Sequence, residues 1–482
     1  MRILLIQLAR LGDIYITWPI VRALARKYPE AKIDLVVRKR FAEACAGLES
    51  IHELHILETD KILGPLLVDD LGLEAVNASN REFSSFADRL SRNAYDQVIN
   101  LSFSPFSSYL TSLVTGEKTS VSGYTRYQDG SFCVADPVSQ YFYSQIGVGS
   151  YNRIHLVELF SMIAGVVVAP EDWRAPDYLP AKETQPNIVI HVGASQNDKM
   201  VHRDSWVKII HALSQNRKYK ILLVGAKAEA KIASSIVEML SQGNIENLVG
   251  KTSLKELFQI IQSAQLVIGG DSSPIHVAPL TETPCLNISF SSVNFWETGP
   301  RSAKSRVLYF HTPHELDTTA VVEESFSLLN DEEPRQASVR SSDASSFYEV
   351  LRDADHEFEW SLLLALYFGS SFPSSPDALF VNSLIRLQEV SQVVQQQLDI
   401  LERNPAQKTA LGIIERLDEV TEKIGELVPS ARILTRWLMG HKINIPPGSL
   451  NDIINQTRQL YAKLDQVISN YTSVARETPK NI

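Results

Sequence analysis

"VIGGDSSPIHVAPL" (residues 267–280) begins as an apolar strand, passes through two glycines and continues as a helix. Asp271, Ser272 and Ser273 stand where the strand gives way to the helix, and His276 follows one turn later. In open α/β sheets, ligands bind at the loops that follow the carboxyl ends of the strands. The stretch therefore predicts a doubly wound sheet with a functional site at this loop.

Apolar strands alternate with amphipathic helical patterns in two successive sets. The first set has strands predicted at 2–7, 32–37, 52–57 and 95–101. The second follows the proline-rich segment 174–186, with strands predicted at 187–192, 219–225, 265–270, 285–290 and 306–310. Such spacing is typical of a parallel sheet covered by helices on both faces. We expect an α/β protein with two doubly wound domains, 1–173 and 187–329, facing one another across a cleft.

The composition changes after residue 329. Residues 330–346 are polar and predict an exposed linker. Residues 347–482 predict a helical bundle, in which the segment 355–368 is expected to pack onto the sheet domains. Two apolar stripes repeat at about 3.5 residues, typical of helices packed in a bundle: Ile413, Leu417, Val420, Ile424 and Leu427, then Leu450, Ile453, Thr457, Leu460, Leu464 and Val467. These stripes predict burial within the bundle, against the sheet domains, or against a second subunit or protein partner.

The overall composition indicates which binding partners and which cellular compartment the protein is expected to have. Of 482 residues, 44% are hydrophobic and 21% charged, with a formal net charge of −10, which argues against nucleic acid. Cys45, Cys133 and Cys285 lack metal-site or disulfide spacing. The apolar runs are too short for a signal peptide or a membrane span. These features predict a cytoplasmic protein, and they leave open a peripheral contact at the inner membrane.

The first candidate residue follows the first predicted strand, in "ARLGDIYITWP" (9–19). Gly12 permits a sharp turn, and Asp13 is then expected at the carboxyl end of the strand. A carboxylate there can take a proton from a substrate hydroxyl. An aspartate at this position equally suits the capping of a helix N-terminus, so spacing alone leaves both roles open.

The second candidate lies in "HVGASQNDK" (191–199), after the first strand of the second set. Lys199 and the hydroxyl of Ser195 could bind a diphosphate, since lysine acts as a point charge toward phosphate. The alternative is an ordinary solvated loop lysine.

The third candidate is the helix start at Ser272 and Ser273. Its free N–H groups and hydroxyls predict an anion site, and Asp271 would reach past a phosphate to the hydroxyls of an attached sugar. The alternative makes Asp271 or Ser272 a helix cap and His276 a core residue.

Four stretches together resemble glycosyltransferase family 9, the ADP-heptose:lipopolysaccharide heptosyltransferases. They are residues 2–37, "HVGASQNDK", "GGDSSPIHVAPLTETP" (269–284) and "SFSSVNFWETGP" (289–300). The resemblance covers about residues 1–310. It implies a GT-B fold and an inverting sugar transfer that needs no metal or cofactor, with ADP-heptose as the expected donor and a glycan, lipid-linked or protein acceptor.

The resemblance also implies roles for individual residues. Asp13 corresponds to the catalytic base of the family, and Asp271 to the acid that touches the donor sugar. The remaining residues implied in donor binding are Gly12, Ser195, Lys199, Ser272, Ser273 and His276.

The chain departs from the family pattern at several positions. Ser273 stands where the family usually has glycine, and Val293, Asn294 and Phe295 replace Thr-Asp-Pro. The helices after residue 346 are also unusual for the family. Two other functions therefore stay open at this point: a non-catalytic module that binds a nucleotide sugar, and a scaffold that acts through its helical domain.

Overall fold

The computed structural model describes most of the chain, in two compact units. Unit 1 contains Met1–Ser102, Val114–Ser120 and Arg153–Ala354, and unit 2 contains Phe103–Leu113, Val121–Asn152 and Asp355–Ile482. The described residues are 1–67, 72–147, 151–180, 182–194, 196–240, 244–332, 338–341, 348–350, 356–374 and 376–477.

The first sheet has the order β3-β2-β1-β4-β5-β6. β1 pairs in parallel with β2 and β4, and β2 pairs in parallel with β3, whereas β5 and β6 are antiparallel. The four strands predicted for the first set are thereby confirmed. The strands are β1 (Arg2–Ile6), β2 (Lys32–Arg38), β3 (Glu53–Leu57), β4 (Gln97–Asn100), β5 (Ser120–Arg126) and β6 (Phe132–Val134).

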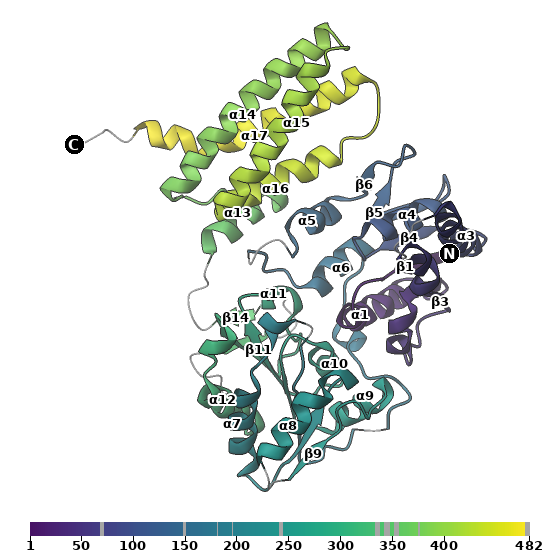
Figure 1. The fold of residues 1–482 in the computed structure, drawn as a ribbon, viewed down its shortest axis with the longest axis vertical. Coiled ribbons are helices and arrows are strands. Elements are labelled where there is room, and N and C mark those ends of the chain that lie inside the picture. The colour runs from purple at the N-terminus through teal and green to yellow at the C-terminus, as the bar shows by residue number, and fades with distance from the viewer. Residues whose placement is uncertain are drawn as a thin grey trace. The chain divides into compact units, whose positions relative to one another are not determined.

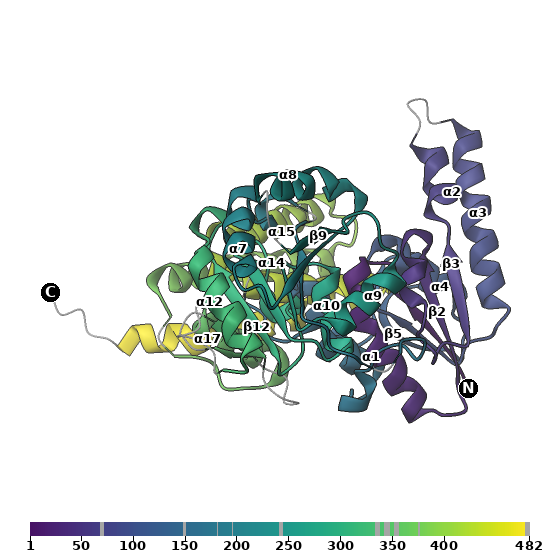
Figure 2. The same ribbon diagram turned by 90° about the horizontal axis from the view of Figure 1, so that it is seen from below.

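Helices separate these strands, as a parallel sheet requires. The central helix α1 (Leu11–Lys27) buries nearly all of its residues from Ile14 to Leu24. The polar segment 58–94 forms α2 (Thr59–Leu63), a short 3₁₀ turn and α3 (Leu73–Ser91), and Figure 2 shows α2 and α3 side by side. The other helices up to residue 164 are α4 (Pro105–Val114), α5 (Pro137–Gln145) and α6 (Leu156–Ala164).

The second sheet has the order β14-β13-β12-β11-β10-β7-β8-β9. Its strands are β7 (Asn187–His191), β8 (Lys220–Val224), β9 (Ile245–Asn247), β10 (Leu266–Gly269), β11 (Cys285–Phe290), β12 (Ser305–Phe310), β13 (Ser338–Ser341) and β14 (Tyr348–Val350). β7 to β12 are parallel, whereas β13 and β14 pair antiparallel at one edge. These two short strands lie in or beside the segment expected to be a linker.

The helices of the second sheet enclose a separate apolar core. They are α7 (Arg203–Ser214), α8 (Ala230–Leu240), α9 (Leu254–Ser263), α10 (Ser273–Leu280), α11 (Phe295–Thr298) and α12 (Thr318–Leu329). Strand residues such as Ile190 and Leu223 pack there with Trp206 and Ile209 of α7. Two α/β domains with parallel sheets, a GT-B-like architecture, are thus present as predicted.

Aromatic side chains join the two sheet domains within unit 1. Trp18 of α1 stacks on Phe258 of α9, with ring centroids 5.5 Å apart, and Tyr15 meets the same ring edge-on at 5.3 Å. Such pairs add about 0.5–1.5 kcal/mol to the gain from burial. The helix that begins at the candidate loop of the first sheet is therefore packed directly against the second domain.

Unit 2 contains the predicted helical bundle (Figure 1). Its C-terminal helices are α13 (Glu357–Phe368), α14 (Ala378–Arg403), α15 (Lys408–Leu427), α16 (Pro429–Ile443) and α17 (Leu450–Glu477). The stripe on α17 is buried at Leu460, Leu464 and Val467, but on α15 Val420 is 45% exposed and Leu427 is 80% exposed. The α15 stripe is thus only partly covered by the chain itself.

The bundle shares unit 2 with segments from the first half of the chain. Gln145 of α5 donates from Nε2 to the carbonyl of Ile433 at 3.1 Å, and Tyr141 packs edge-on against Tyr367. The hydroxyl of Tyr127 donates to the carbonyl of Asn444 at 3.1 Å. Residues 121–152 therefore belong with the bundle in space. No described helix is long and apolar enough to cross a membrane.

A buried carboxylate ties the first three strands together. Asp34 of β2 accepts hydrogen bonds from Arg2 Nε at 2.9 Å, from the Tyr95 hydroxyl at 2.9 Å and from His52 Nδ1 at 3.1 Å. Burial alone would raise the pKa of Asp34, but the hydrogen bonds from His55, Arg2, Tyr95 and His52 outweigh it and hold the pKa at about 2.

We expect Asp34→Asn to lower the free energy of unfolding by about 3 kcal/mol, because Arg2 would lose its buried counter-charge. In the wild type, the lowered pKa contributes stability that is present above the unfolded-state value and is lost as the pH falls toward 2, on the order of 2 kcal/mol in total. Urea unfolding between pH 5 and 2 measures both effects. Asp88→Asn, at an exposed position of α3, is the control; equal midpoints for the two variants would contradict the assignment.

Candidate functional site

The loop between β1 and α1 is held by hydrogen bonds from several directions. Leu8 N donates to Ser102 Oγ at 2.5 Å, and Arg38 Nη2 donates to the carbonyl of Ala9 at 2.6 Å. Asp13 lies in the first turn of α1, and its Oδ2 accepts from Arg10 N at 2.8 Å. Through this bond Asp13 Oδ2 helps to cap the N-terminus of α1, and the other oxygen of the carboxylate, Oδ1, is available to a substrate.

Gly12, the second residue of α1, lets the start of this helix contact the second domain. A Cβ on residue 12 would lie 2.6 Å from Cδ2 and 2.9 Å from Nε2 of His276, closer than real Cβ atoms come to other heavy atoms. His276 lies on α10, which follows β10 of the second sheet. The absence of a side chain at residue 12 is thus what allows the first loop to touch the candidate helix.

The Asp13 carboxylate is electrostatically coupled to the second domain. Burial raises the pKa of Asp13 above its ordinary value of 3.8, and nearby Asp271 adds to the rise. The Arg10 N–H, the His276 ring and the Arg10 side chain oppose it. A carboxylate with a raised pKa is a stronger base once it is ionised, which suits proton abstraction.

The β10–α10 loop carries the second group of candidate residues. Lys199 Nζ lies 3.3 Å from Asp271 Oδ2, so the two predicted donor-binding residues form an ion pair. Ser272 is the residue before α10, and Ser273 is the first residue of the helix. His276 is buried, and burial lowers its pKa, which keeps the ring neutral at pH 7. Ser195 lies outside the described residues.

Two polar residues that the sequence did not predict as site residues, His191 and Glu229, form a chain of polar contacts with Ser272. Ser272 Oγ is 3.0 Å from His191 Nδ1, and His191 Nε2 is 3.6 Å from Glu229 Oε2. Any Cβ on Gly193 would overlap with the Glu229 carboxylate. His191 ends β7, and Glu229 follows β8 within one loop. The available signal was position: His191 is at the carboxyl end of a strand and Glu229 follows the next one, where ligands gather.

A third group joins α6 to the segment after α11. His155 Nε2 donates to the carbonyl of Gly299 at 2.9 Å, and His155 Nδ1 accepts from Val157 N. Arg301 Nη2 pairs with Glu158 Oε1 at 2.6 Å. Burial lowers the pKa of His155 well below its ordinary value, so the ring is neutral. This group adds a polar connection between the two sheet domains.

The residues that depart from the family pattern lie around α11. Asn294 caps this short helix by accepting from Trp296 N at 3.2 Å. Val293 is buried, and the ring of Phe295 stacks on Trp296. The residues at positions 293–295 are thus each part of the local packing or capping of this segment.

The described residues include one cluster with the composition of a metal site, formed by Asp34, Glu53 and His55. Asp34 Oδ2 already accepts from Arg2 and Tyr95, and Arg2 also pairs with Glu53 at 3.2 Å. A guanidinium group thus fills the position that a cation would need. The cluster is explained as a structural ion pair that joins β1, β2 and β3.

Comparisons with known proteins agree on one family. A family model described as glycosyltransferase family 9 (heptosyltransferase) matches residues 83–324. Lipopolysaccharide heptosyltransferase 3 of Escherichia coli K12 is 26% identical over 289 residues, which cover 58% of this chain and 79% of that protein.

Solved structures share the fold at lower identity. E. coli heptosyltransferase WaaC with ADP aligns with a TM-score of 0.52 and 19% identity, over 68% of this chain and all of that one. The same enzyme with ADP-2-deoxy-2-fluoro heptose aligns with a TM-score of 0.51 and 18% identity, over the same shares.

Gly12→Ala is expected to lower the free energy of unfolding by about 1–3 kcal/mol, because the methyl group would be forced into the His276 ring. Chemical denaturation provides the measurement. Gly64→Ala is the matched control, since nothing lies within 4 Å of a Cβ there. Adding His276→Ala to the Gly12→Ala variant should give less than the sum of the two single effects. Additive effects would show that residues 12 and 276 are not in contact.

Proposed function

Because this chain belongs to glycosyltransferase family 9 (heptosyltransferase), we propose that it transfers a heptose from a nucleotide-diphosphate donor to a hydroxyl of a lipopolysaccharide-core acceptor. The observation that carries the proposal is the approach of the Asp13 loop to α10, which joins a candidate base to a candidate phosphate site. Membership of the family makes the protein a glycosyltransferase; the donor, the acceptor and the inverting course are the proposed part.

Asp13 is proposed as the general base. Its carboxylate takes the proton of the acceptor hydroxyl while that oxygen attacks the anomeric carbon of the donor sugar. The bond from the anomeric carbon to the diphosphate oxygen breaks in the same step, and its electron pair leaves with the diphosphate. One displacement of this kind inverts the anomeric configuration.

The start of α10 and Lys199 are proposed to receive the leaving diphosphate. The first N–H groups of a helix carry partial positive charge, and the hydroxyls of Ser272 and Ser273 add donors beside them. Lys199 supplies a full positive charge, at present paired with Asp271. When the donor binds, Lys199 would exchange its ion pair with Asp271 for a contact with the diphosphate. The Asp271 carboxylate would then be available to accept hydrogen bonds from hydroxyls of the sugar. Ser195 would add a further hydroxyl.

The proposal of ADP-heptose as the donor rests on the relatives. WaaC was solved with ADP and with a fluorinated ADP-heptose, and the relatives are named as lipopolysaccharide heptosyltransferases. The buried neutral ring of His276, held against Gly12, is proposed to line the same donor site. Release of nucleoside diphosphate that depends on acceptor is the measurement that separates this enzyme from a module that only binds the donor.

Asp13→Asn is expected to keep donor affinity while lowering turnover by about 10²–10⁴-fold, the usual effect of losing a general base. In the wild type, kcat/KM for the acceptor should rise with pH as Asp13 loses its proton, with a midpoint above 3.8 because burial raises this pKa. Transfer assays at a series of pH values measure turnover, and calorimetric titration with the donor measures donor affinity. Wild-type turnover in the variant would leave Asp13 with a capping role alone.

Lys199→Ala and Asp271→Ala should differ in their effect on ligands. Loss of Lys199 should weaken the bare nucleoside diphosphate, because a charged contact to phosphate is removed. Loss of Asp271 should weaken the nucleotide sugar yet spare or tighten the bare diphosphate, because a nearby negative charge disappears and Lys199 is released. Calorimetric titration of both ligands into both variants is decisive. Equal losses for the two ligands would refute separate sugar and phosphate roles.

A further inference from the structure

Two arginines at the end of β2 lie beside the Asp13 loop. Arg38 is the last residue of β2 and is bonded to the carbonyl of Ala9 at 2.6 Å. Arg38 and Arg40 both contact the ring of Phe41, with their guanidinium carbons 4.9 Å and 4.7 Å from its centroid. The negative charge of Asp13 acts on Arg38 and favours its charged form, which opposes the lowering of the Arg38 pKa by burial. β2 is the neighbour of β1 in the sheet, so these side chains lie at the same edge as the candidate base.

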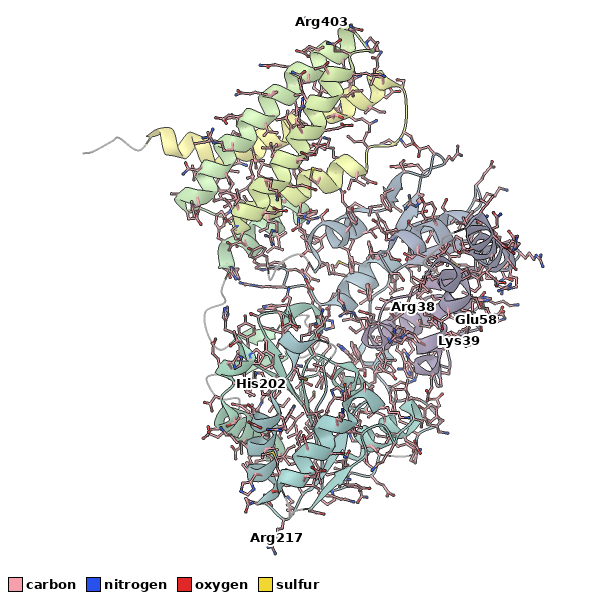
Figure 3. All side chains as sticks on the ribbon, viewed as in Figure 1. Arg38, Lys39, Glu58, His202, Arg217 and Arg403 are labelled. Atoms are coloured by element: carbon pink, nitrogen blue, oxygen red, sulfur yellow. The ribbon has the colours of Figure 1, made fainter. Side chains whose placement is uncertain are left out.

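Neither guanidinium group forms an ion pair with a carboxylate in the described part of the chain. Lys39, between them in sequence, pairs with Glu58 at 2.8 Å, and Glu58 also binds Lys61. Figure 3 labels Arg38, Lys39 and Glu58 on the first sheet domain. For Arg38 and Arg40, by contrast, no described carboxylate lies within ion-pair distance, and Arg38 Nε is buried without any partner.

A partly buried arginine with an unsatisfied N–H is costly to the folded state. Burial of a donor without a hydrogen bond carries a desolvation penalty, which is larger when the group is charged. Arg40 adds like-charge repulsion, which together with burial lowers the pKa of Arg38. An anion bound by Arg38 would satisfy its free N–H, and the charge of the anion would offset the repulsion from Arg40. The planar guanidinium fork fits the oxygens of a phosphate or a carboxylate.

We propose that Arg38 and Arg40 form an oxyanion site that binds a phosphate or carboxylate group of the acceptor next to the hydroxyl that Asp13 deprotonates. The proposal rests on the proposed transferase function and specifies its acceptor as an anionic saccharide. The site lies on the first sheet domain, whereas the proposed diphosphate site is on α10 of the second. Donor affinity should therefore not depend on either arginine.

A kinetic experiment tests the site with core oligosaccharide in three forms: intact, dephosphorylated with hydrofluoric acid, and carboxyl-reduced. Arg38→Gln and Arg40→Gln should each raise KM for the intact acceptor by about 10- to 100-fold, the scale for one charged hydrogen bond. The donor KM should stay unchanged. The chemical treatment that removes the bound group should raise the wild-type KM equally and should abolish the effect of the substitutions, which identifies the group as phosphate or carboxylate.

Lys39→Gln is the matched control, since it removes the same charge from the same loop but breaks only the pair with Glu58. It should leave KM for the acceptor unchanged. A fall in kcat without a change in acceptor KM for Arg38→Gln would overturn the proposal and leave Arg38 as a support for Ala9. Equal effects of Lys39→Gln and Arg40→Gln would overturn it as well, because they would reflect net charge alone.

A second experiment does not depend on transfer. The Nε–Hε signal of Arg38 in a ¹H–¹⁵N spectrum, assigned by its loss in Arg38→Lys, should shift saturably as inorganic phosphate is added. Arg40→Gln should weaken this titration, and Lys39→Gln should not. If no acceptor is turned over and the signal still titrates in this way, the transferase proposal fails and the anion site stands. A signal that does not move refutes the site.

Discussion

The imidazole of His276 occupies the space that a side chain on residue 12 would need, and the geometry of the candidate site depends on this contact. It fixes how near the end of β1 comes to the start of α10. Aromatic packing of Tyr15 and Trp18 on Phe258 stabilises the same approach further along α1. Because well-packed interfaces deform little, a change of one methyl group at residue 12 would be transmitted to both loops.

The site combines charges of opposite sign with neutral histidines. Burial and the nearby charge of Asp271 raise the pKa of Asp13, and Lys199 forms an ion pair with Asp271. His155 and His276 are kept neutral by burial, so neither adds positive charge; His155 contributes hydrogen bonds and His276 contributes its contact with residue 12. A negatively charged ligand would meet Lys199 on the second sheet domain and the arginines near Asp13 on the first.

Sequence patterns predicted the two sheets because buried parallel strands appear as continuous apolar runs. They also pointed to Asp13 and Asp271, which lie at the starts of the helices that follow two of these strands. His191 and Glu229 were missed because one lies inside a strand pattern and the other in an ordinary charged loop, and only the tertiary fold brings them to Ser272. The helical stripes predicted buried faces. They could not predict that α5, far away in sequence, would pack against two other helices of the bundle, α13 and α16.

Unit 2 combines segments from the first third of the chain with its C-terminal helices, so the ribosome synthesises its parts at different times. About 200 residues separate Asn152 from Asp355, which at the usual rate of translation corresponds to roughly 10–40 s. During that interval Tyr141 and Gln145 of α5 have no α13 or α16 to cover them. The ribosome-bound chain therefore leaves this face of α5, which includes Ser144 beside the tyrosine and the glutamine, uncovered until α13 and α16 are made. Unit 2 can therefore be completed only after every described strand of both sheets has been synthesised.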